Sequence, residues 1–345
     1  MGPWMAPDEP PQWGCDFGPD VDNLSVIDRV EPPPDSDNDK VTSARTNRST
    51  LPTTAEGTHR NAFGPLEWSL FLSVSGIWGA SFLFIAIGLD TLHPGVVTMG
   101  RVGLGAITLA LVPGTRTHID RADMPRIALL GVTWLALPLT LFPIAQQWID
   151  SSVAGMLNAL MPILTAVIAS LLLRRLPAGA QLLGLFVGLV GVVLISVPTL
   201  GQGDTQILGV ILVALATLCY AISGNLSAPL AQKYGSLPVL ARVQVIAAVL
   251  TIPYGLVGLP HSSWAWGPVA AVAVLGVAGT GLAYVAFGTL IGRAGATRAS
   301  VVTYVIPVVA VVLGVVIRHE EVASLALVGA ALVISGALLT SRREI

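Results

Sequence analysis

Long apolar segments separated by short polar connections fill the chain from about residue 66 onward. A helix needs about 20 mostly apolar residues to cross a bilayer, and ten segments have this character. They lie near residues 67–89, 94–113, 126–146, 150–173, 178–197, 206–226, 236–258, 266–289, 296–317 and 322–340. The connections leave no room for a soluble domain. The pattern therefore predicts an all-α polytopic membrane protein with ten transmembrane helices.

The second half of this pattern repeats the first. A shift of 145 positions aligns residues 151–194 with residues 296–339 without a gap. The aligned residues include one proline pair and two glycine pairs: Pro162 with Pro307, Gly184 with Gly329, and Gly191 with Gly336. The register is weaker over the earlier helices. A duplicated block of membrane helices is typical of a transporter whose halves surround a central site.

The basic residues of the connecting loops predict the orientation. The even-numbered loops and the C-terminus carry ten of them: Arg116, Arg121, Arg126, Arg174, Arg175, Lys233, Arg293, Arg298, Arg342 and Arg343. The odd-numbered loops carry only Arg318. Because cytoplasmic loops are enriched in Arg and Lys, both termini are expected in the cytoplasm. Five helices per half then make the halves inverted repeats, at residues 63–200 and 201–345.

Composition separates a polar tail from the membrane part. Only 11% of the 345 residues are charged, whereas a soluble domain carries about 25%. Residues 1–60 nevertheless hold eleven acidic and five basic side chains and are rich in Pro, Asp, Ser and Thr. Such a segment buries too little apolar surface to fold alone. We expect a disordered, acidic, Pro-rich cytoplasmic tail over residues 1–62.

The paired prolines are the first candidates for a substrate site. Pro162 and Pro307 fall near the middle of the fourth and ninth predicted helices. A proline inside a helix frees the carbonyl four residues earlier, which belongs here to Asn158 and Thr303. In hydrocarbon a free carbonyl needs a partner or a cavity. The hypothesis is that Asn158, Thr303 and Tyr304 line a cavity, and the alternative is a structural kink bonded to a neighbouring helix.

Two arginines are the charged residues well inside predicted spans. Arg101 and Arg242 each cost about 2.5–3.5 kcal/mol on insertion scales, so such residues are rarely idle. Either guanidinium is suited to attract an anionic substrate group such as a carboxylate. The structural alternative is an arginine bonded to backbone carbonyls or snorkelling to an interface.

Aromatic rings are a third class of candidate. Trp78, Tyr220, Tyr284 and Tyr304 lie within predicted spans. Such rings can wall a cavity and stack on a flat or cationic solute, although ordinary packing is their more frequent use. The small residues Gly184 and Gly188 form a GxxxG pattern that Gly191 extends, which predicts a close helix contact.

Several kinds of chemistry lack a sequence signal. No predicted span contains Asp or Glu beyond its first residue, which argues against a proton carrier at the midplane. Exchange and facilitated transport are the modes that remain. Acids at span ends read as loop charges: Asp90, Asp150, Glu320 and Glu321. The histidines show no metal-ligand spacing, and neither a P-loop nor a GxSxG elbow occurs. Asp120 and Asp123 form only a short loop pair. No cofactor, metal, nucleic acid or enzymatic activity is expected.

Two segments carry a resemblance to a known family. They are WGASFLFIAIGL with the following Arg101, and AGTGLAYVAFGTLIGRAGATRASVVTYVIPVVAVVLGVVIRHEEVASLALVGAALVISGALL. The chain resembles the drug/metabolite transporter superfamily of the EamA (RhaT-like) type over roughly residues 67–340. The resemblance implies two five-helix repeats, a central cavity and metabolite or drug export. The family's Glu ahead of a Gly is present as Glu320, but Arg175 stands at the matching position of the first half.

These observations lead to one expectation and two alternatives. The expected function is secondary transport of a small metabolite or drug-like solute by alternating access, with export of amino acids or related compounds implied by the resemblance. The partners are that solute and the lipid bilayer of the cytoplasmic membrane, with a homodimer left open. The alternatives are a membrane-embedded enzyme acting on a lipid-like substrate, and a non-transporting sensor or scaffold whose working part is the acidic tail.

Overall fold

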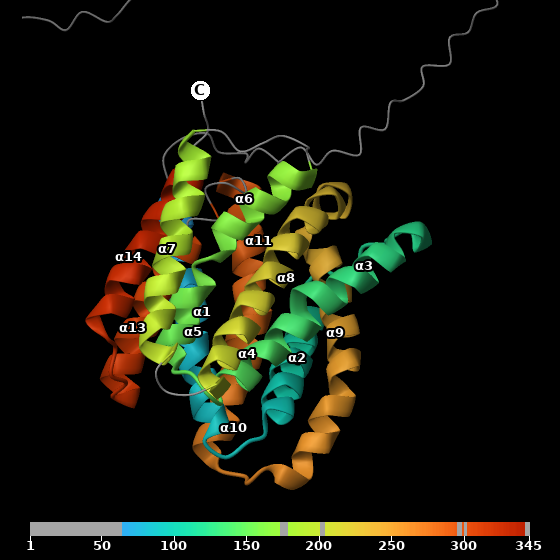
Figure 1. The fold of residues 1–345 in the computed structure, drawn as a ribbon. Coiled ribbons are helices and arrows are strands. Elements are labelled where there is room, and N and C mark those ends of the chain that lie inside the picture. The colour runs from blue at the N-terminus through green and yellow to red at the C-terminus, as the bar shows by residue number, and fades with distance from the viewer. Residues whose placement is uncertain (1–63, 173–178, 201–203, 295–298, 300–301, 342–345) are drawn as a thin grey trace, which may run out of the picture. The chain divides into compact units, whose positions relative to one another are not determined.

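A computed structural model describes residues 64–172, 179–200, 204–294, 299 and 302–341, and its regular elements there are all helical (Figure 1). The elements of the first half are α1 (Pro65–Leu89), α2 (Pro94–Ala110), η1 (Arg121–Asp123), α3 (Met124–Leu130), η2 (Gly131–Ala136), α4 (Leu137–Ala145), α5 (Ser151–Asn158), α6 (Met161–Leu172) and α7 (Ala180–Leu200). Those of the second half are α8 (Asp204–Tyr234), α9 (Ser236–Gly258), η3 (Leu259–His261), α10 (Trp266–Val274), η4 (Leu275–Leu282), α11 (Ala283–Ala294), α13 (Val302–Arg318) and α14 (Ser324–Ser341). The predicted tail over residues 1–62 lies outside the described residues.

The apolar segments of the sequence coincide with these helices. Six helical segments among the described residues are long and apolar enough to cross a membrane, and four shorter apolar helices accompany them. Every predicted span overlaps one of the ten. The chain is thus a multi-pass membrane protein, while the crossing of the bilayer by all ten segments stays a prediction.

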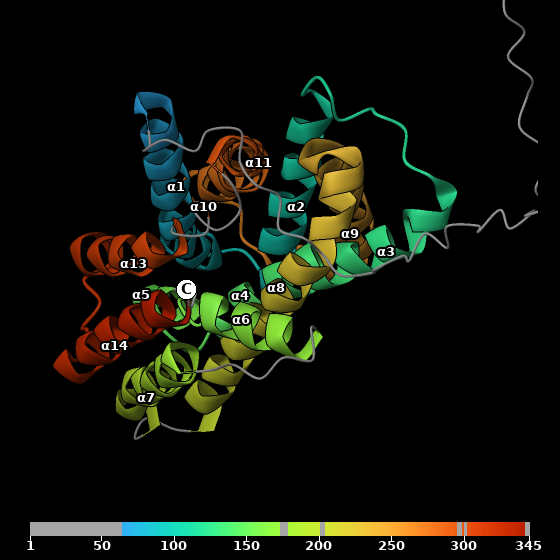
Figure 2. The ribbon, with the colours of Figure 1, turned by 90° about the horizontal axis from the view of Figure 1, so that it is seen from above.

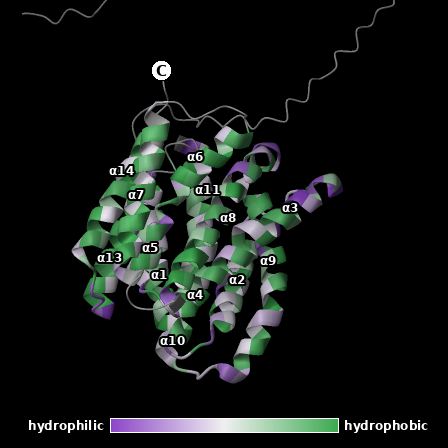
Figure 3. Cartoon of the chain, in the orientation of Figure 1, coloured by the Kyte–Doolittle hydropathy of each residue, from purple (hydrophilic) through white to green (hydrophobic). Residues whose placement is uncertain are grey.

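The outer surface suits a lipid environment. Large apolar side chains are exposed on the helices, such as Leu72 at 60% and Phe186 at 67%. Hydrophobic residues make up most of the length of these helices (Figure 3). A soluble monomer rarely exposes apolar surface so extensively. Lipid tails cover such side chains without the hydrophobic cost that water would impose.

Helices from the two halves pack in matching pairs. α7 lies along α14 and α2 lies along α9, and in the repeat register each pair joins equivalent helices (Figures 1 and 2). The remaining contacts match in the same way. α1 packs on α13 and on α10–α11, while its counterpart α8 packs on α6 and on α4. The third helix of each half also contains a π-helical segment: η2 lies between α3 and α4, and η4 lies between α10 and α11.

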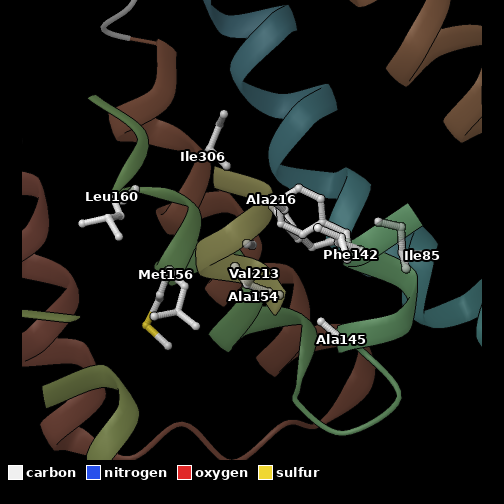
Figure 4. Close-up of a cluster of buried hydrophobic side chains, with 14 of the residues drawn as sticks. Ile85, Phe142, Ala145, Ala154, Met156, Leu160, Val213, Ala216 and Ile306 are labelled. Carbon is white, nitrogen blue, oxygen red and sulfur yellow. The ribbon is translucent and has the colours of Figure 1, made fainter. Parts of the chain in front are cut away.

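The core joins helices that are distant in the sequence. Ile85 of α1, Phe142 of α4, Met156 of α5, Val213 of α8 and Ile306 of α13 meet in one buried cluster (Figure 4). Because each comes from a different helix, these residues fix how the helices cross. Packing of this kind holds membrane helices together when the lipid is as apolar as the side chains.

The paired prolines produce different structures in the two halves. In the first half the helix breaks at residues 159–160, just before Pro162. The backbone N–H groups of these two residues donate to carbonyls three residues earlier, which ends α5 in a tight turn. In the second half α13 runs without a break through Pro307. As a result α5 packs on α13, whereas α6 turns away to pack on α8 and α14.

Glycines allow α7 and α14 to touch backbone to backbone, as the GxxxG pattern predicted. A Cβ atom on Gly336 would lie 2.5 Å from the carbonyl oxygen of Gly184 and 2.6 Å from the nitrogen of Gly188. A Cβ on Gly191 would lie 2.6 Å from the carbonyl oxygen of Gly329. These obstacles are main-chain atoms and cannot rotate away, so the sequence needs glycine there.

We expect Gly336→Ala to destabilise the protein by about 1–3 kcal/mol, because the added methyl forces the two backbones apart. Gly103→Ala is the matched control, since a Cβ at Gly103 of α2 meets nothing within 4 Å. The thermal unfolding midpoint of the purified chain in detergent measures both. Equal midpoints for the two variants would contradict the close contact.

Candidate functional site

The local structure of α2 places a charged side chain deep in the helix bundle. The helix begins at Pro94, where the preceding His93 caps it by accepting a bond from the Gly95 N–H (3.1 Å). Arg101 follows about 10 Å along the axis, at a rise of about 1.5 Å per residue. Its side chain is only 6% exposed, and its Nε donates to the Thr280 hydroxyl at 2.9 Å. Arg101 is therefore buried among helices and does not snorkel to an interface.

The π-helical segment η4 supplies the groups that face α1 and α2. Its sequence, LGVAGTGL, is built of small residues, and the Thr280 hydroxyl donates to the Leu275 carbonyl five residues earlier (2.9 Å). The Gly279 carbonyl accepts a bond from the Trp78 indole N–H at 3.1 Å. A π turn is wider than an α turn and frequently marks a functional site. Here it directs one carbonyl and one hydroxyl toward Trp78 and Arg101.

Aromatic rings from four helices surround this point. Trp78 meets Tyr284 edge-on, with ring centroids 5.4 Å apart, and Trp134 of η2 reaches the same Tyr284 at 6.2 Å. Tyr220 of α8 lies against Phe142 at 5.9 Å. Both Trp78 and Tyr220 border each of the two main apolar clusters. We call Arg101, Thr280, Trp78, Tyr220 and Tyr284 the Arg101 cluster.

The polar ends within the Arg101 cluster are short of partners. The Tyr220 and Tyr284 phenols lie within electrostatic range of the Arg101 guanidinium. Apart from the Nε–Thr280 bond, neither the guanidinium nor either phenol hydroxyl hydrogen-bonds another residue within the described part of the chain. The polar side-chain atoms that are fully enclosed and unbonded in the described part of the chain do not include any from Arg101, Tyr220 or Tyr284. Their polar ends therefore face accessible space.

Gln244 of α9 extends this polar region. It is fully buried, its amide donates to the Val102 carbonyl at 3.0 Å, and its Oε1 is enclosed without a partner. Gly105 of α2 packs against both Gln244 and Thr280. A Cβ atom on Gly105 would lie 2.7 Å from the Gln244 side-chain nitrogen and 2.9 Å from the Thr280 methyl.

Sequence reasoning missed Thr280, Gln244, Trp134 and both π segments. It searched the spans for charges, prolines and aromatics, and it left Trp134 unassigned. Counting uncharged polar residues inside apolar spans would have found Gln244 and Thr280. The π segments have no comparable signal, because their residues also suit an α-helix.

The residues around the prolines lie on α5, α6 and α13. Asn158 ends α5 with 6% exposure, and its Oδ1 is enclosed without a partner. Thr303 and Tyr304 are buried in the first turn of α13, where the Tyr304 hydroxyl donates to the Ala337 carbonyl of α14 at 3.1 Å. Pro307 is buried and Pro162 is partly exposed. Tyr304 thus makes a structural bond, while Asn158 retains an unused acceptor.

Arg242 is bonded to backbone carbonyls, as expected for an arginine with a structural role. Its guanidinium donates to the backbone carbonyls of Thr115, Thr117 and Pro238, the second of these at 2.7 Å. These bonds pin the connection after α2 to the first turns of α9. The structure therefore separates the two arginines that the sequence treated alike.

Acidic residues at the rims join the two halves. Glu320 accepts bonds from the Ser151 and Ser152 backbone N–H groups at 3.0 and 2.9 Å, so it caps α5 from the second half of the chain. Arg318 pairs with Asp90 at 2.8 Å. At the opposite rim Lys233 pairs with Asp120 and Asp123, both at 2.8 Å.

The Asp120–Asp123 pair contacts a lysine and a tyrosine of α8. The hydroxyl of Tyr234 lies within hydrogen-bond distance of both carboxylates (2.8 and 2.7 Å), and Lys233 pairs with each of them. The bond from Lys233 lowers the pKa of Asp120 below its usual range. No group of three or more potential metal ligands occurs among the described residues.

A small apolar pocket lies beside the Arg101 cluster. It has a volume of about 180 Å³ between α1 and the α10–η4 region, and Gly279 and Ser81 are part of its lining. Its other lining residues are apolar, so it offers no group for recognising a charged solute.

Comparisons with known proteins identify the family and the fold. The EamA-like transporter family matches residues 66–197 and again residues 207–342. An uncharacterized transporter of Archaeoglobus fulgidus is 24% identical over 81% of this chain and 99% of its own length. A protein of Streptantibioticus cattleyicolor named "Probable terminal-alkyne amino-acid exporter" is 28% identical over 81% of this chain and 94% of its own. A solved crystal structure shares the fold, with a TM-score of 0.56 at 19% identity over 79% of this chain and 95% of its own.

Asp150, the residue before α5, gives a prediction about pH. Desolvation raises its pKa, and the nearby Glu320 carboxylate raises it further, although Arg318 opposes both. The folded protein therefore holds this proton more tightly than the unfolded chain, and the ionised form lowers stability. Stability is expected to rise as pH falls through the raised pKa toward the ordinary value.

Asp150→Asn should accordingly raise the thermal midpoint near neutral pH, and this gain should disappear in acid. Glu321→Gln is the control, because it removes an equal charge from an exposed position on the same rim. Melting curves of the full chain in detergent across this pH range measure the effect. A gain for Asp150→Asn that does not change with pH would refute the assignment.

Proposed function

The chain belongs to the EamA-like transporter family and is a membrane transporter of small solutes, and from this premise we propose a secondary transporter that works by alternating access. Its cargo is a small metabolite or drug-like solute, and its direction is export across the cytoplasmic membrane. Amino acids and related compounds are proposed because one relative is named as an amino-acid exporter. The observation that carries the proposal is the Arg101 cluster, where polar groups from both halves face accessible space.

The proposed architecture is two inverted five-helix repeats, at residues 63–200 and 201–345. The family matches the chain twice, once in each half, and the helix contacts correspond when the halves are exchanged. An odd number of crossings per half then gives the halves opposite orientations, which is a common basis of alternating access.

The proposed orientation has both termini in the cytoplasm. Among the described loops, the rim with Arg116, Arg121 and Lys233 is rich in basic residues, whereas the opposite rim has Arg318. Cytoplasmic loops carry the excess of Arg and Lys. The Asp120–Lys233 contacts are then cytoplasmic, and the Glu320 cap of α5 is external.

The described conformation supports a state closed toward the outside. At the external rim α5 packs on α13, where a Cβ on Gly155 would lie 2.3 Å from the Ala310 methyl. Glu320 holds the end of α5 in place. Beyond the break at residues 159–160, α6 turns from α13 toward α8 and α14. The fourth and ninth helices thus meet on the outer side and part on the cytoplasmic side.

Within this scheme the candidate residues take different parts. Arg101, Trp78, Tyr220 and Tyr284 form the proposed substrate site. Asn158 and Pro162 lie at the helix break, and Thr303, Tyr304 and Pro307 lie on the facing helix α13, so they belong to the proposed moving elements. Arg242 is the exception, because its three carbonyl contacts give it a structural role.

The alternatives receive less support. A membrane-embedded enzyme would need a set of reactive groups, yet the short acidic pair of Asp120 and Asp123 is neutralised by Lys233. Membership of a transporter family points away from enzymatic activity. A sensor whose working part is the tail is distinguished by experiment.

Counterflow in proteoliposomes with a panel of metabolites tests the function. We expect saturable exchange of at least one solute, retained after deletion of residues 1–62. We also expect flux without an imposed pH gradient, because the predicted spans have no Asp or Glu beyond their first residues. The absence of flux for every solute, or its loss with the tail, would contradict the proposal. Strict dependence on the gradient would move the coupling role to the rim acids.

Glu320→Gln should weaken the external closure, because an uncharged amide cannot match a carboxylate that accepts bonds from two backbone N–H groups. A chain with Cys15→Ser, Cys219→Ser and Asn158→Cys then reports the change through labelling by an impermeant maleimide from outside. We expect labelling several-fold faster with Glu320→Gln than with Glu321→Gln. Equal labelling rates would argue that the Glu320 bonds do not hold the external side closed.

A further inference from the structure

Arg101 is a buried positive charge without a counter-ion. Its contacts to described residues are the Thr280 hydroxyl and the electrostatic influence of two phenols. We infer that Arg101 recognises a carboxylate group of the transported solute, together with Tyr220 and Tyr284. This inference rests on the proposed function and names the chemical class of its cargo.

The geometry of the guanidinium supports this role. An arginine has five N–H donors, and a bidentate carboxylate takes two parallel bonds from one edge of the fork. Thr280 occupies Nε, so the two Nη groups remain. Those groups are neither bonded within the described residues nor enclosed. The edge suited to a carboxylate is therefore directed at accessible space in a side chain that is 94% buried.

The two phenols extend the recognition surface. Tyr220 belongs to α8 and Tyr284 to α11. Tyr284 packs on Trp78, whose indole bonds Gly279, the residue before the Arg101 partner Thr280. The two phenol hydroxyls also lack a bond within the described residues and are not enclosed. A carboxylate offers about four lone-pair positions and can accept from the guanidinium and the hydroxyls together. Arg101 and Tyr284 come from different halves of the chain, so such a ligand would bridge them.

Arg242 shows what a purely structural arginine looks like in the same protein. Its guanidinium donates to three backbone carbonyls at the rim. Arg101 bonds no backbone carbonyl of the described residues, although it lies deeper in the bundle. A desolvated charge left unpaired lowers stability. Its presence is explained when a ligand supplies the negative charge.

The surrounding residues define the rest of the solute. Trp78 and Trp134 both pack against Tyr284, and aromatic rings gathered there suit a flat or branched apolar group. An amino group on the solute would find ring faces and the Tyr hydroxyls rather than an acid. The inferred class is therefore apolar carboxylates, including zwitterionic amino acids, and purely cationic solutes are disfavoured.

Phenylacetate and phenylacetamide are suitable probes, because they share a ring and differ in charge. Binding to the purified full chain is followed by intrinsic tryptophan fluorescence, to which Trp78 and Trp134 contribute. We expect phenylacetate to bind at least about tenfold more tightly than the amide, as expected for a hydrogen bond to a charged group. Arg101→Gln should abolish this preference, and Arg101→Lys should restore part of it.

Arg242→Gln is the matched control, and thermal stability separates the two roles. Arg101→Gln should keep or raise the unfolding midpoint, since it removes an unpaired buried charge. Arg242→Gln should lower the midpoint and keep the preference for phenylacetate. The inference is overturned if phenylacetate shows no saturable binding, if its preference survives Arg101→Gln, or if Arg101→Gln unfolds while Arg101→Lys has no preference.

Thr280 is a positioning residue for Arg101. Thr280→Val should reduce the preference for phenylacetate several-fold, and Thr280→Ser should retain it, because the serine hydroxyl can still accept from Nε. Proteoliposome flux is measured in parallel. Flux of uncharged solutes without carboxylate preference would support the transport function and refute this inference. Tight phenylacetate binding without any flux would support this inference and contradict the transport function.

Discussion

Inside a bilayer every polar atom needs a partner or access to water, and this constraint governs the whole structure. Helices satisfy their own backbones, and hydroxyl side chains return to the carbonyl one turn earlier, as Thr108, Thr165 and Thr217 do. Against this background the exceptions are informative. Among the described residues they include the Arg101 cluster, Gln244 and Asn158, where the fold leaves donors or acceptors unused, and also both polar atoms of the Gln146 amide.

The π segment η4 connects local backbone structure to this chemistry. Its wide turn lets the Gly279 carbonyl bond the Trp78 indole and the Thr280 hydroxyl accept from Arg101. Small residues make the close approach feasible, since a Cβ on Gly276 would lie 2.5 Å from the Leu104 Cβ. The segment thereby ties α1 and α2 of one half to the other half at the point where charge is buried.

The two halves share a packing plan but differ in detail. Glu320 caps the first-half helix α5, whereas Arg175 occupies the matching position of the first half and lies outside the described residues. The first-half helix breaks before Pro162, while α13 continues through Pro307. Such differences suit a transporter whose two faces perform different tasks, because one rim must open while the other stays closed.

The sequence by itself determined the helical membrane class, the positions of the apolar segments, the family and the glycine contact between α7 and α14. These follow from local composition and spacing, which the bilayer converts directly into helices. It also named Arg101, Trp78, Tyr220 and Tyr284 as candidates, yet it could not separate Arg101 from Arg242. Only the tertiary structure decided that Arg242 meets backbone carbonyls and Arg101 meets Thr280, because these partners lie 125–127 and 179 positions away in the chain. Burial and hydrogen bonding depend on how distant helices pack, and no local pattern encodes that.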